Sequence, residues 1–263
     1  MKFGISTACF YPEDLLKSIE RLTAENVCCM EIFVNTIGEV TKEFAKEVNS
    51  VTSSGIKITS VHPFTSGYEH ILLFSDYYRR FEESIDFYKR YSEFACRVGA
   101  DIVVLHGDKR FEGSGGISDF EYFERYYKLR EAMKREGAVL AQENVNLFRS
   151  QSPEFIEKMI KYLGNDVDFV FDIKQAVRSK NNPFDVCRAM GNRIAHMHIN
   201  DNDGYNDCLL PGKGTMDYEK ILGMMRSQGY GGNAVIEVYR RNFSDMEDIV
   251  QSYRMLNRNF GNL

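Results

Sequence analysis

The stretch RIAHMHINDND (193–203) carries two histidines inside an apolar run and then turns acidic. His196 and His198 stand two residues apart, so in a strand they share one face, and Asn200 shares that face as well. A short, near-continuously apolar segment is typical of a parallel strand covered on both sides. The stretch therefore predicts a buried strand over IAHMHIND (194–201) with a polar end. Its meaning depends on whether other strands end in the same way.

Seven other segments are short, rich in Val, Ile and Phe, and apolar until their last residues. They are KFGISTACF (2–10), VCCMEIFVN (27–35), IKITSVHPF (56–64), DIVVLHGD (101–108), AVLAQENV (138–145), VDFVFDIKQ (167–175) and NAVIEVY (233–239). Helical patterns separate them; within residues 76–100, for example, Phe81, Ile85 and Tyr88 share one face. Eight strands each followed by a helix, without a linker, predict a single-domain α/β fold, a (β/α)8 TIM barrel over residues 1–263.

An open doubly wound sheet is the competing architecture. Its nucleotide-binding form would have a GxGxxG motif after the first strand, where this chain has ACFYPEDLL (8–16). The Gly-rich pieces GSGG (113–116) and PGKG (211–214) fall in the loops predicted after the fourth and seventh strands. Because PGKG lacks the Walker spacing, we interpret its glycines as turn formers and favour the barrel.

Composition argues against some classes of partner. The 263 residues are 43% hydrophobic, enough for one large core, and the net charge of −5 is spread along the chain. Nucleic acids and anionic membranes favour concentrated Lys and Arg, so neither is an expected partner. The sequence has no signal-peptide pattern and no run able to span a bilayer, and its six cysteines follow no metal or redox spacing. These features predict a cytoplasmic protein.

The predicted strands place ionisable residues near one rim of the barrel. TIM barrels form their sites at the C-terminal ends of the strands, where side chains alternate between the lumen and the helix layer. The residues concerned are Glu31, His62, His106, Glu143, Asp172, His198 and Glu237. A lone histidine here is usually a hydrogen-bonded core residue, and a lone carboxylate can cap the next helix. Because charged residues are rarely buried without partners, the whole set favours a functional site.

Three of the carboxylates, Glu143, Asp172 and Glu237, would converge with few cations near them. Like charges at short range in a partly dry cavity repel or raise one another's pKa. A divalent metal removes the conflict, and three carboxylates with one imidazole suit Mn²⁺ best, with Mg²⁺, Co²⁺ or Zn²⁺ as alternatives. We therefore predict one divalent ion bound by these carboxylates and His198, with His196 packed one layer deeper.

At these residues the chain resembles the xylose-isomerase-like barrel superfamily of sugar and sugar-phosphate isomerases and epimerases, over nearly its whole length. The resemblance is carried by QENV with Glu143, FDIKQ with Asp172, the HMH of 196–198, the PGKGTMD loop and VIEVY with Glu237. It implies the metal set given above, and it implies that Glu143 and Glu237 are also the catalytic residues, removing and returning a proton. A metal chelated by the oxygens of a hydroxyketone acidifies the C–H between them and stabilises the enediolate.

The resemblance further implies a small-molecule sugar substrate, free or phosphorylated. The expected substrate contacts are His62, His106, Gln175 and Lys213. Gln175 stands where many ketose epimerases carry a His, and Gly204 stands where an Arg often follows the His of the seventh strand. Lys174 and Arg178 are further cations that could take a phosphate or a carboxylate, although a surface position is the more common role for such residues. These departures concern substrate contacts, so the reaction class is predicted better than the substrate.

Three alternatives stay open at this point. A dehydratase acting on an inosose-type ketone would use the same metal and the same proton abstraction, followed by loss of water. A zinc-dependent abasic-site endonuclease of the same superfamily would need a three-metal cluster, and its further ligands are lacking at Gln175 and near Asn206–Cys208. The third alternative is a non-catalytic binding module, and the Tyr-rich helix predicted over 77–94 could pack on the barrel or form a homo-oligomer.

Overall fold

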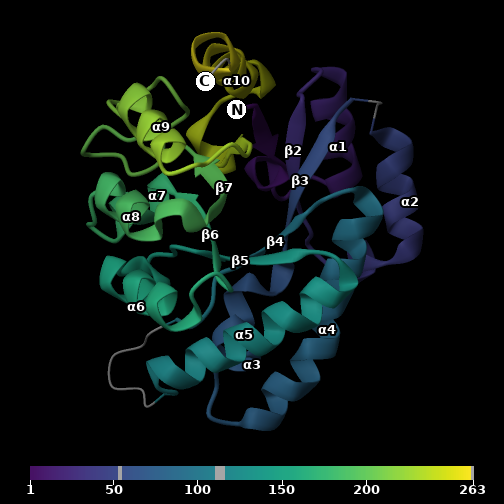
Figure 1. Ribbon diagram of the computed structural model, residues 1–263. Helices are drawn as coiled ribbons and strands as arrows, with labels where there is room; N and C mark the ends of the chain where they lie inside the picture. The colour runs from purple at the N-terminus through teal and green to yellow at the C-terminus, as the bar shows by residue number, and fades with distance from the viewer. Residues whose placement is uncertain (53–54, 110–115, 262–263) are drawn as a thin grey trace.

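The computed structural model describes residues 1–52, 55–109 and 116–261 (Figure 1). In this part of the chain eight strands form a closed parallel barrel in sequence order, and β1 pairs with β8 to complete the ring. The strands are β1 (Phe3–Ser6), β2 (Cys29–Phe33), β3 (Lys57–His62), β4 (Ile102–Leu105), β5 (Val139–Glu143), β6 (Asp168–Asp172), β7 (Ile194–Ile199) and β8 (Ala234–Ile236). The prediction of a single-domain (β/α)8 TIM barrel is confirmed.

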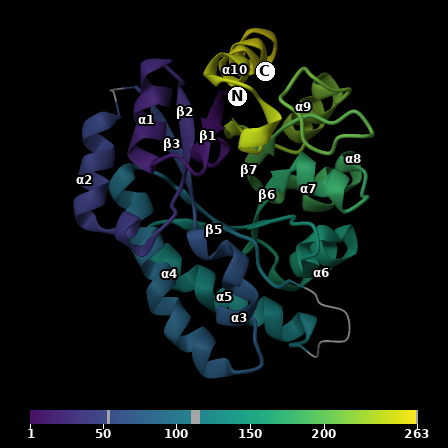
Figure 2. The same ribbon diagram turned by 180° about the vertical axis from the view of Figure 1, so that it is seen from behind.

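Helices surround the ring of strands (Figure 1, Figure 2). They are α1 (Leu15–Ala24), α2 (Lys42–Val51), α3 (Glu69–Leu72), α4 (Tyr78–Val98), α5 (Asp119–Glu136), α6 (Pro153–Leu163), α7 (Ile173–Arg178), α8 (Pro183–Met190), α9 (Tyr218–Ser227) and α10 (Met246–Phe260). The long helix α4 ends at Gly99, which takes the left-handed conformation. Tyr88 and Tyr91 of α4 are buried in the core. Within the described residues no helix combines the length and the apolar character needed to cross a bilayer.

The barrel lumen is apolar at its floor and polar at its mouth. Val104, Ala141 and Val170 form a small buried cluster apart from the main core. Each of them stands two residues before a polar residue of the rim, respectively His106, Glu143 and Asp172. Because alternate residues of a strand share a face, the polar side chains lie above the apolar layer, at the end of the barrel where such folds place their sites.

The strands end earlier than the sequence pattern predicts, because polar side chains at their ends cap the next element. Residues 7–10, which the pattern assigns to the first strand, form a 3-10 helix whose first turn is capped by the Ser6 hydroxyl. Residues 173–175, assigned to the sixth strand, begin α7, since the Asp172 carboxylate accepts the N–H of Gln175 (3.2 Å). The rim residues therefore face the mouth from turns as well as from strands.

The acidic end of RIAHMHINDND organises the loop between β7 and α9. The Asp201 carboxylate accepts the backbone N–H groups of Gly212 (2.9 Å), Gly214 (3.0 Å) and Met216 (2.9 Å). A Cβ on Gly214 would lie 2.2 Å from the carbonyl oxygen of Asn202, so only glycine fits this close approach. The glycines of PGKG thus shape a turn as predicted, whereas residues 113–115 of the other Gly-rich piece lie outside the described residues.

Candidate metal centre

Four side chains from consecutive strands converge at the C-terminal mouth of the barrel. Glu143 ends β5, Asp172 ends β6, His198 lies in β7 and Glu237 directly follows β8. Their ligating atoms all lie within 4.8 Å of one another. His198 Nδ1 is 3.1 Å from Glu237 Oε2, 3.4 Å from Glu143 Oε1 and 3.7 Å from Asp172 Oδ2. The structure thus brings together the four residues that the sequence predicts as metal ligands.

These residues fit a divalent cation. Among the described residues, Asp172 Oδ2 is buried and accepts no hydrogen bond, and its contact with a cation is the Lys174 ammonium at 3.3 Å. A buried oxygen in this state raises the free energy of the fold unless a cation or a donor satisfies it. Glu237, the most exposed of the four, shows only 13% of its side-chain surface. Three largely buried carboxylates and one imidazole form a donor set that Mn²⁺, Mg²⁺, Co²⁺ or Zn²⁺ accepts.

Charge interactions at the centre are strong because water is largely excluded. Burial lowers the pKa of His198, but the negative charges of Glu31 and Glu237 outweigh burial and hold that pKa well above its usual range. Burial raises the pKa of Asp172, and the neighbouring Lys174 ammonium offsets only part of this rise. Burial also raises the pKa values of Glu143 and Glu237, but neighbouring cations outweigh burial and lower these pKa values below their usual range. Asp172 is therefore the carboxylate of the set whose charge the chain balances least, and a bound metal would supply the missing positive charge there.

Glu31 lies beneath the centre and orients His198. Its Oε2 is 3.0 Å from His198 Nε2 and accepts the Ser60 hydroxyl (2.8 Å), while its Oε1 accepts the Ser6 hydroxyl (3.0 Å). With its raised pKa, His198 carries a proton on both nitrogens when no metal is bound. The carboxylate at Nε2 holds the proton there, so a metal would displace the proton of Nδ1 and bind that nitrogen. His196 lies deeper, as predicted, with Nε2 3.1 Å from the Ser60 hydroxyl.

We expect Glu31→Gln to weaken Mn²⁺ binding about tenfold, because a neutral amide makes the His198 imidazole a less basic ligand. Isothermal titration of the chelator-treated protein with MnCl₂ measures this change. Glu157→Gln, an exposed position on α6, is the matched control and should leave the dissociation constant unchanged. Equal affinity in Glu31→Gln and the wild type would contradict the orienting role.

A cavity of about 630 Å³ opens above the metal set. Its walls combine aromatic rings with a few polar groups: Tyr11, Phe33, Phe64, Tyr68 and Tyr239, together with Asn35, His62, His106, Lys174 and Gln175. Glu143 and Glu237 also reach this space. Such a mixture of apolar surface and convergent polar groups is typical of a small-molecule site.

The predicted substrate contacts separate into two groups in the structure. His62, His106 and Gln175 line the cavity, whereas Lys213 is exposed in the loop before α9. Lys174, for which the sequence favoured a surface position, is instead 3% exposed and lines the cavity beside the metal set. Strand alternation does not predict this position, because Lys174 lies in the first turn of α7 and not on β6.

Glu69 is a buried carboxyl group that supports the wall of the cavity. Its Oε2 accepts the backbone N–H of Gly107 (2.5 Å), directly after His106, and its Oε1 accepts the Tyr88 hydroxyl (2.9 Å). Gly107 has φ +89°, and a Cβ there would lie 2.2 Å from the Tyr122 hydroxyl oxygen. Burial, only partly opposed by these hydrogen bonds, raises the pKa of Glu69 to about 8.

This raised pKa predicts a loss of stability as pH increases. The folded protein keeps the Glu69 proton up to about pH 8, whereas the unfolded chain releases it near an ordinary pKa of about 4.3. Folding therefore binds a proton within this window, and the contribution to stability falls with rising pH by roughly 1.4 kcal/mol per pH unit. Glu69→Gln should reduce the pH dependence of the free energy of unfolding, measured by urea denaturation from pH 5 to 8. A slope equal to that of the wild type would show that Glu69 is not protonated.

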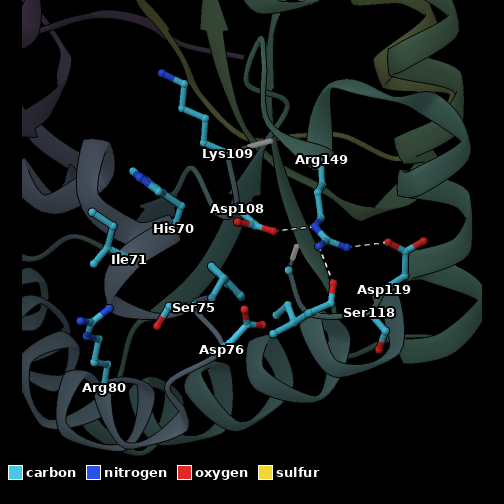
Figure 3. A pocket seen from close by; sticks show the side chains of 13 residues that line it. His70, Ile71, Ser75, Asp76, Arg80, Asp108, Lys109, Ser118, Asp119 and Arg149 are labelled. Atoms are coloured by element: carbon cyan, nitrogen blue, oxygen red, sulfur yellow. Dashed lines mark hydrogen bonds and ion pairs between the residues drawn. The ribbon is translucent and has the colours of Figure 1, made fainter. Parts of the chain in front are cut away.

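A second hollow, of about 590 Å³, shares no lining residue with the cavity above the metal set. Figure 3 shows Arg149 between two carboxylates, bonded to Asp108 (2.6 Å) and Asp119 (2.8 Å). Arg149 also donates to the carbonyl oxygen of Ile117 (2.5 Å). These contacts join the loop after β5 to the start of α5, so the arginine has a structural role here, and none of the predicted site residues reaches this hollow.

Comparison with known proteins agrees with this fold. Residues 17–259 match the model of a family described as xylose isomerase-like TIM barrel. The chain is 24% identical to the uncharacterized protein MJ1311 of Methanocaldococcus jannaschii, over 96% of this chain and 89% of that protein. Among solved structures, a D-tagatose 3-epimerase-like protein has a TM-score of 0.81 at 24% identity, covering 98% of this chain and 96% of the other.

Two further solved structures have the same fold at lower identity. D-psicose 3-epimerase from Clostridium cellulolyticum H10 has a TM-score of 0.77 at 16% identity, covering 97% of this chain and 96% of the other. The IolI protein, solved with a zinc atom, has a TM-score of 0.76 at 18% identity, covering 99% of both chains. Because the family match spans nearly the whole barrel, the chain belongs to the xylose isomerase-like TIM barrel family.

Proposed function

We propose that the protein is a divalent-metal-dependent isomerase or epimerase that acts on a small sugar, ketose or sugar derivative by proton abstraction. The placement of two glutamates carries this proposal. Glu143 and Glu237 come from the ends of β5 and β8, three strands apart around the ring, and both line the cavity. Carboxylates on two sides of a bound substrate can take a proton from a carbon atom and return one to it.

Glu143, Asp172, His198 and Glu237 would hold the cation, and we favour Mn²⁺. When bound, the cation would supply positive charge that stabilises the developing enediolate. Side chains of the protein would orient the substrate and return a proton to it. His106 Nε2 lies 2.9 Å from Glu143 Oε2 and 3.0 Å from His62 Nε2, so this histidine pair stands beside the base. We assign His62, His106 and Gln175 to the hydroxyl groups of the substrate.

The rival activities make different demands on the same cavity. Two further groups have ligating atoms within 4.8 Å of one another: His62, His106 and Glu143, and Glu31, His196 and His198. A three-metal endonuclease would still need an imidazole where Gln175 offers an amide. The acidic chain also supplies few of the concentrated cations that phosphate backbones require. An inosose-type dehydratase would share the base and the metal, so only the product distinguishes it.

A screen in deuterated water tests the proposal. The Mn²⁺-reconstituted protein is incubated with ketoses, inososes and their phosphates, and mass spectrometry measures C–H exchange and loss of water. We expect about one divalent ion per chain and exchange at a carbon next to a carbonyl. Loss of water would reassign the protein as a dehydratase, and efficient nicking of abasic-site DNA would reassign it as an endonuclease. Absence of metal after purification in added Mn²⁺ would overturn the mechanism.

A further inference from the structure

Lys174 places an ammonium group against two of the four metal-ligand candidates. Its Nζ lies 2.9 Å from Glu237 Oε2 and 3.3 Å from Asp172 Oδ2. The same two oxygens face His198 Nδ1, at 3.1 Å and 3.7 Å. The oxygens that would bind a cation together with His198 are therefore already in contact with a positive charge of the chain.

An ammonium and a dication cannot share these oxygens without repulsion. The lysine head group is a compact point charge with three donors and no acceptor. Beside a dication held by the same carboxylates it would lose part of its attraction and gain a repelling neighbour. In the absence of a metal the ammonium offsets part of the negative charge that the buried carboxylates concentrate, a charge that would otherwise oppose folding.

Lys174 also has space into which its head group can move. It is one of the residues that line the cavity, and its Nζ lies 5.1 Å from the centroid of the Tyr239 ring. The four-carbon stem of a lysine rotates freely enough to carry the ammonium away from Asp172. The ammonium already lies over the face of Tyr239, and this contact can be kept while the head group turns away from Asp172.

We propose that Lys174 is a tethered counter-cation of the metal centre. It holds Asp172 and Glu237 when no metal is bound, competes with the metal for their oxygens, and turns into the substrate cavity when the metal binds. The inference rests on the metal centre of the proposed function. It adds that the Lys174 ammonium is a hydrogen-bond donor for the substrate and that its position depends on whether the metal is bound. In the loaded protein the ammonium stands where it can bind an oxygen of the substrate.

Metal affinity of the full chain tests the competition. Isothermal titration with MnCl₂ at pH 8 compares the chelator-treated wild type with Lys174→Met and Lys174→Arg. We expect Lys174→Met to bind Mn²⁺ about tenfold more tightly, because a competing charge is gone, and Lys174→Arg to show no gain. The metal-free Lys174→Met protein should have a lower melting temperature than the metal-free wild type, and Mn²⁺ should raise its melting temperature by more than that of the wild type. Lys161→Met, at an exposed position on α6, is the control with an unchanged dissociation constant.

A second measurement needs no substitution at the site. The wild type is labelled with an amine-reactive ester, with and without Mn²⁺, and peptide mass spectrometry compares Lys174 with Lys161. We expect Mn²⁺ to raise the labelling of Lys174 severalfold and to leave Lys161 unchanged. Unchanged labelling of Lys174, or equal or weaker Mn²⁺ binding by Lys174→Met, overturns the proposal. If either of these negative results is obtained while the wild type binds Mn²⁺ and exchanges substrate protons, only the counter-cation role of Lys174 is disproved. If the wild type binds no divalent ion, the metal centre of the proposed function is disproved as well.

Discussion

Glu143→Gln and Glu237→Gln are each expected to slow the exchange of substrate C–H with deuterated water by about 10²–10⁴-fold. An amide keeps the shape of the side chain and an oxygen for the cation, but it cannot accept a proton at neutral pH. Both carboxylates reach the cavity from different sides of the barrel mouth. The loss should therefore appear in the exchange rate at saturating Mn²⁺ and saturating substrate.

The two glutamates can be told apart by the starting compound. The substrate and the product of the reaction are tested separately. A glutamate that takes a proton from one face of the substrate carbon should be needed more for exchange from one of these compounds than from the other. Titration with MnCl₂ on the same variants separates loss of the base from loss of the metal. Exchange at the wild-type rate in either variant, with metal bound, would show that the corresponding glutamate is a ligand only.

The alternation of apolar strands and amphipathic helices was enough to predict the barrel, because each strand carries its own signal. Glu143 and Asp172 could be predicted as neighbours because they end consecutive strands, and the ends of parallel strands meet at one rim. His198 was separated from His196 by its position nearer the mouth, and the structure has this order. Once a closed ring of strands is assumed, the order of the strand-end residues along the sequence therefore predicts their order around the rim.

The sequence pattern was less informative where a residue depends on what packs above or below it. Lys174 lies in the first turn of α7, where the pattern predicts strand, and nothing in the neighbouring sequence shows that Glu237, sixty-three positions away, faces it. Glu31 was placed at the rim, but the register of β2 against β3 shifts between Met30 and Glu31, and its carboxylate contacts His198 from beneath. Such contacts follow from packing in three dimensions, and periodicity along the chain does not contain them.

Two amides fix the position of Asp172 and explain why its Oδ2 faces the metal set. Asn144 exchanges two hydrogen bonds with the backbone of Asp172, accepting its N–H (2.8 Å) and donating to its carbonyl oxygen (2.9 Å). Asn200 donates to Asp172 Oδ1 (3.0 Å), which also accepts the N–H of Gln175. Oδ1 is thus held by donors, and Oδ2 is directed toward His198 and Lys174.

Asp172→Asn is therefore expected to lower Mn²⁺ affinity by at least about 100-fold, a larger effect than the loss of an outer contact. The remaining oxygen of the asparagine would stay at the place of Oδ1, where Asn200 and Gln175 donate to it. The amide nitrogen would then take the place of Oδ2 and direct its hydrogens toward the cation. Removal of one charge from a crowded set of carboxylates also relieves repulsion, so the metal-free variant should stay folded. Titration with MnCl₂ and a thermal melt of the metal-free protein measure the two effects.

Asp168→Asn is the matched control, since Asp168 begins the strand that Asp172 ends. Its carboxylate pairs with Arg130 (3.3 Å) and Arg193 (3.4 Å) at the opposite end of the barrel. In TIM barrels that end serves stability, so this variant should lose up to about 1 kcal/mol of stability and keep its Mn²⁺ affinity. If both variants bind Mn²⁺ as the wild type does, the cation is not held at the mouth of the barrel. If both lose it equally, the effect comes from strand β6 as a whole rather than from the oxygen that faces His198.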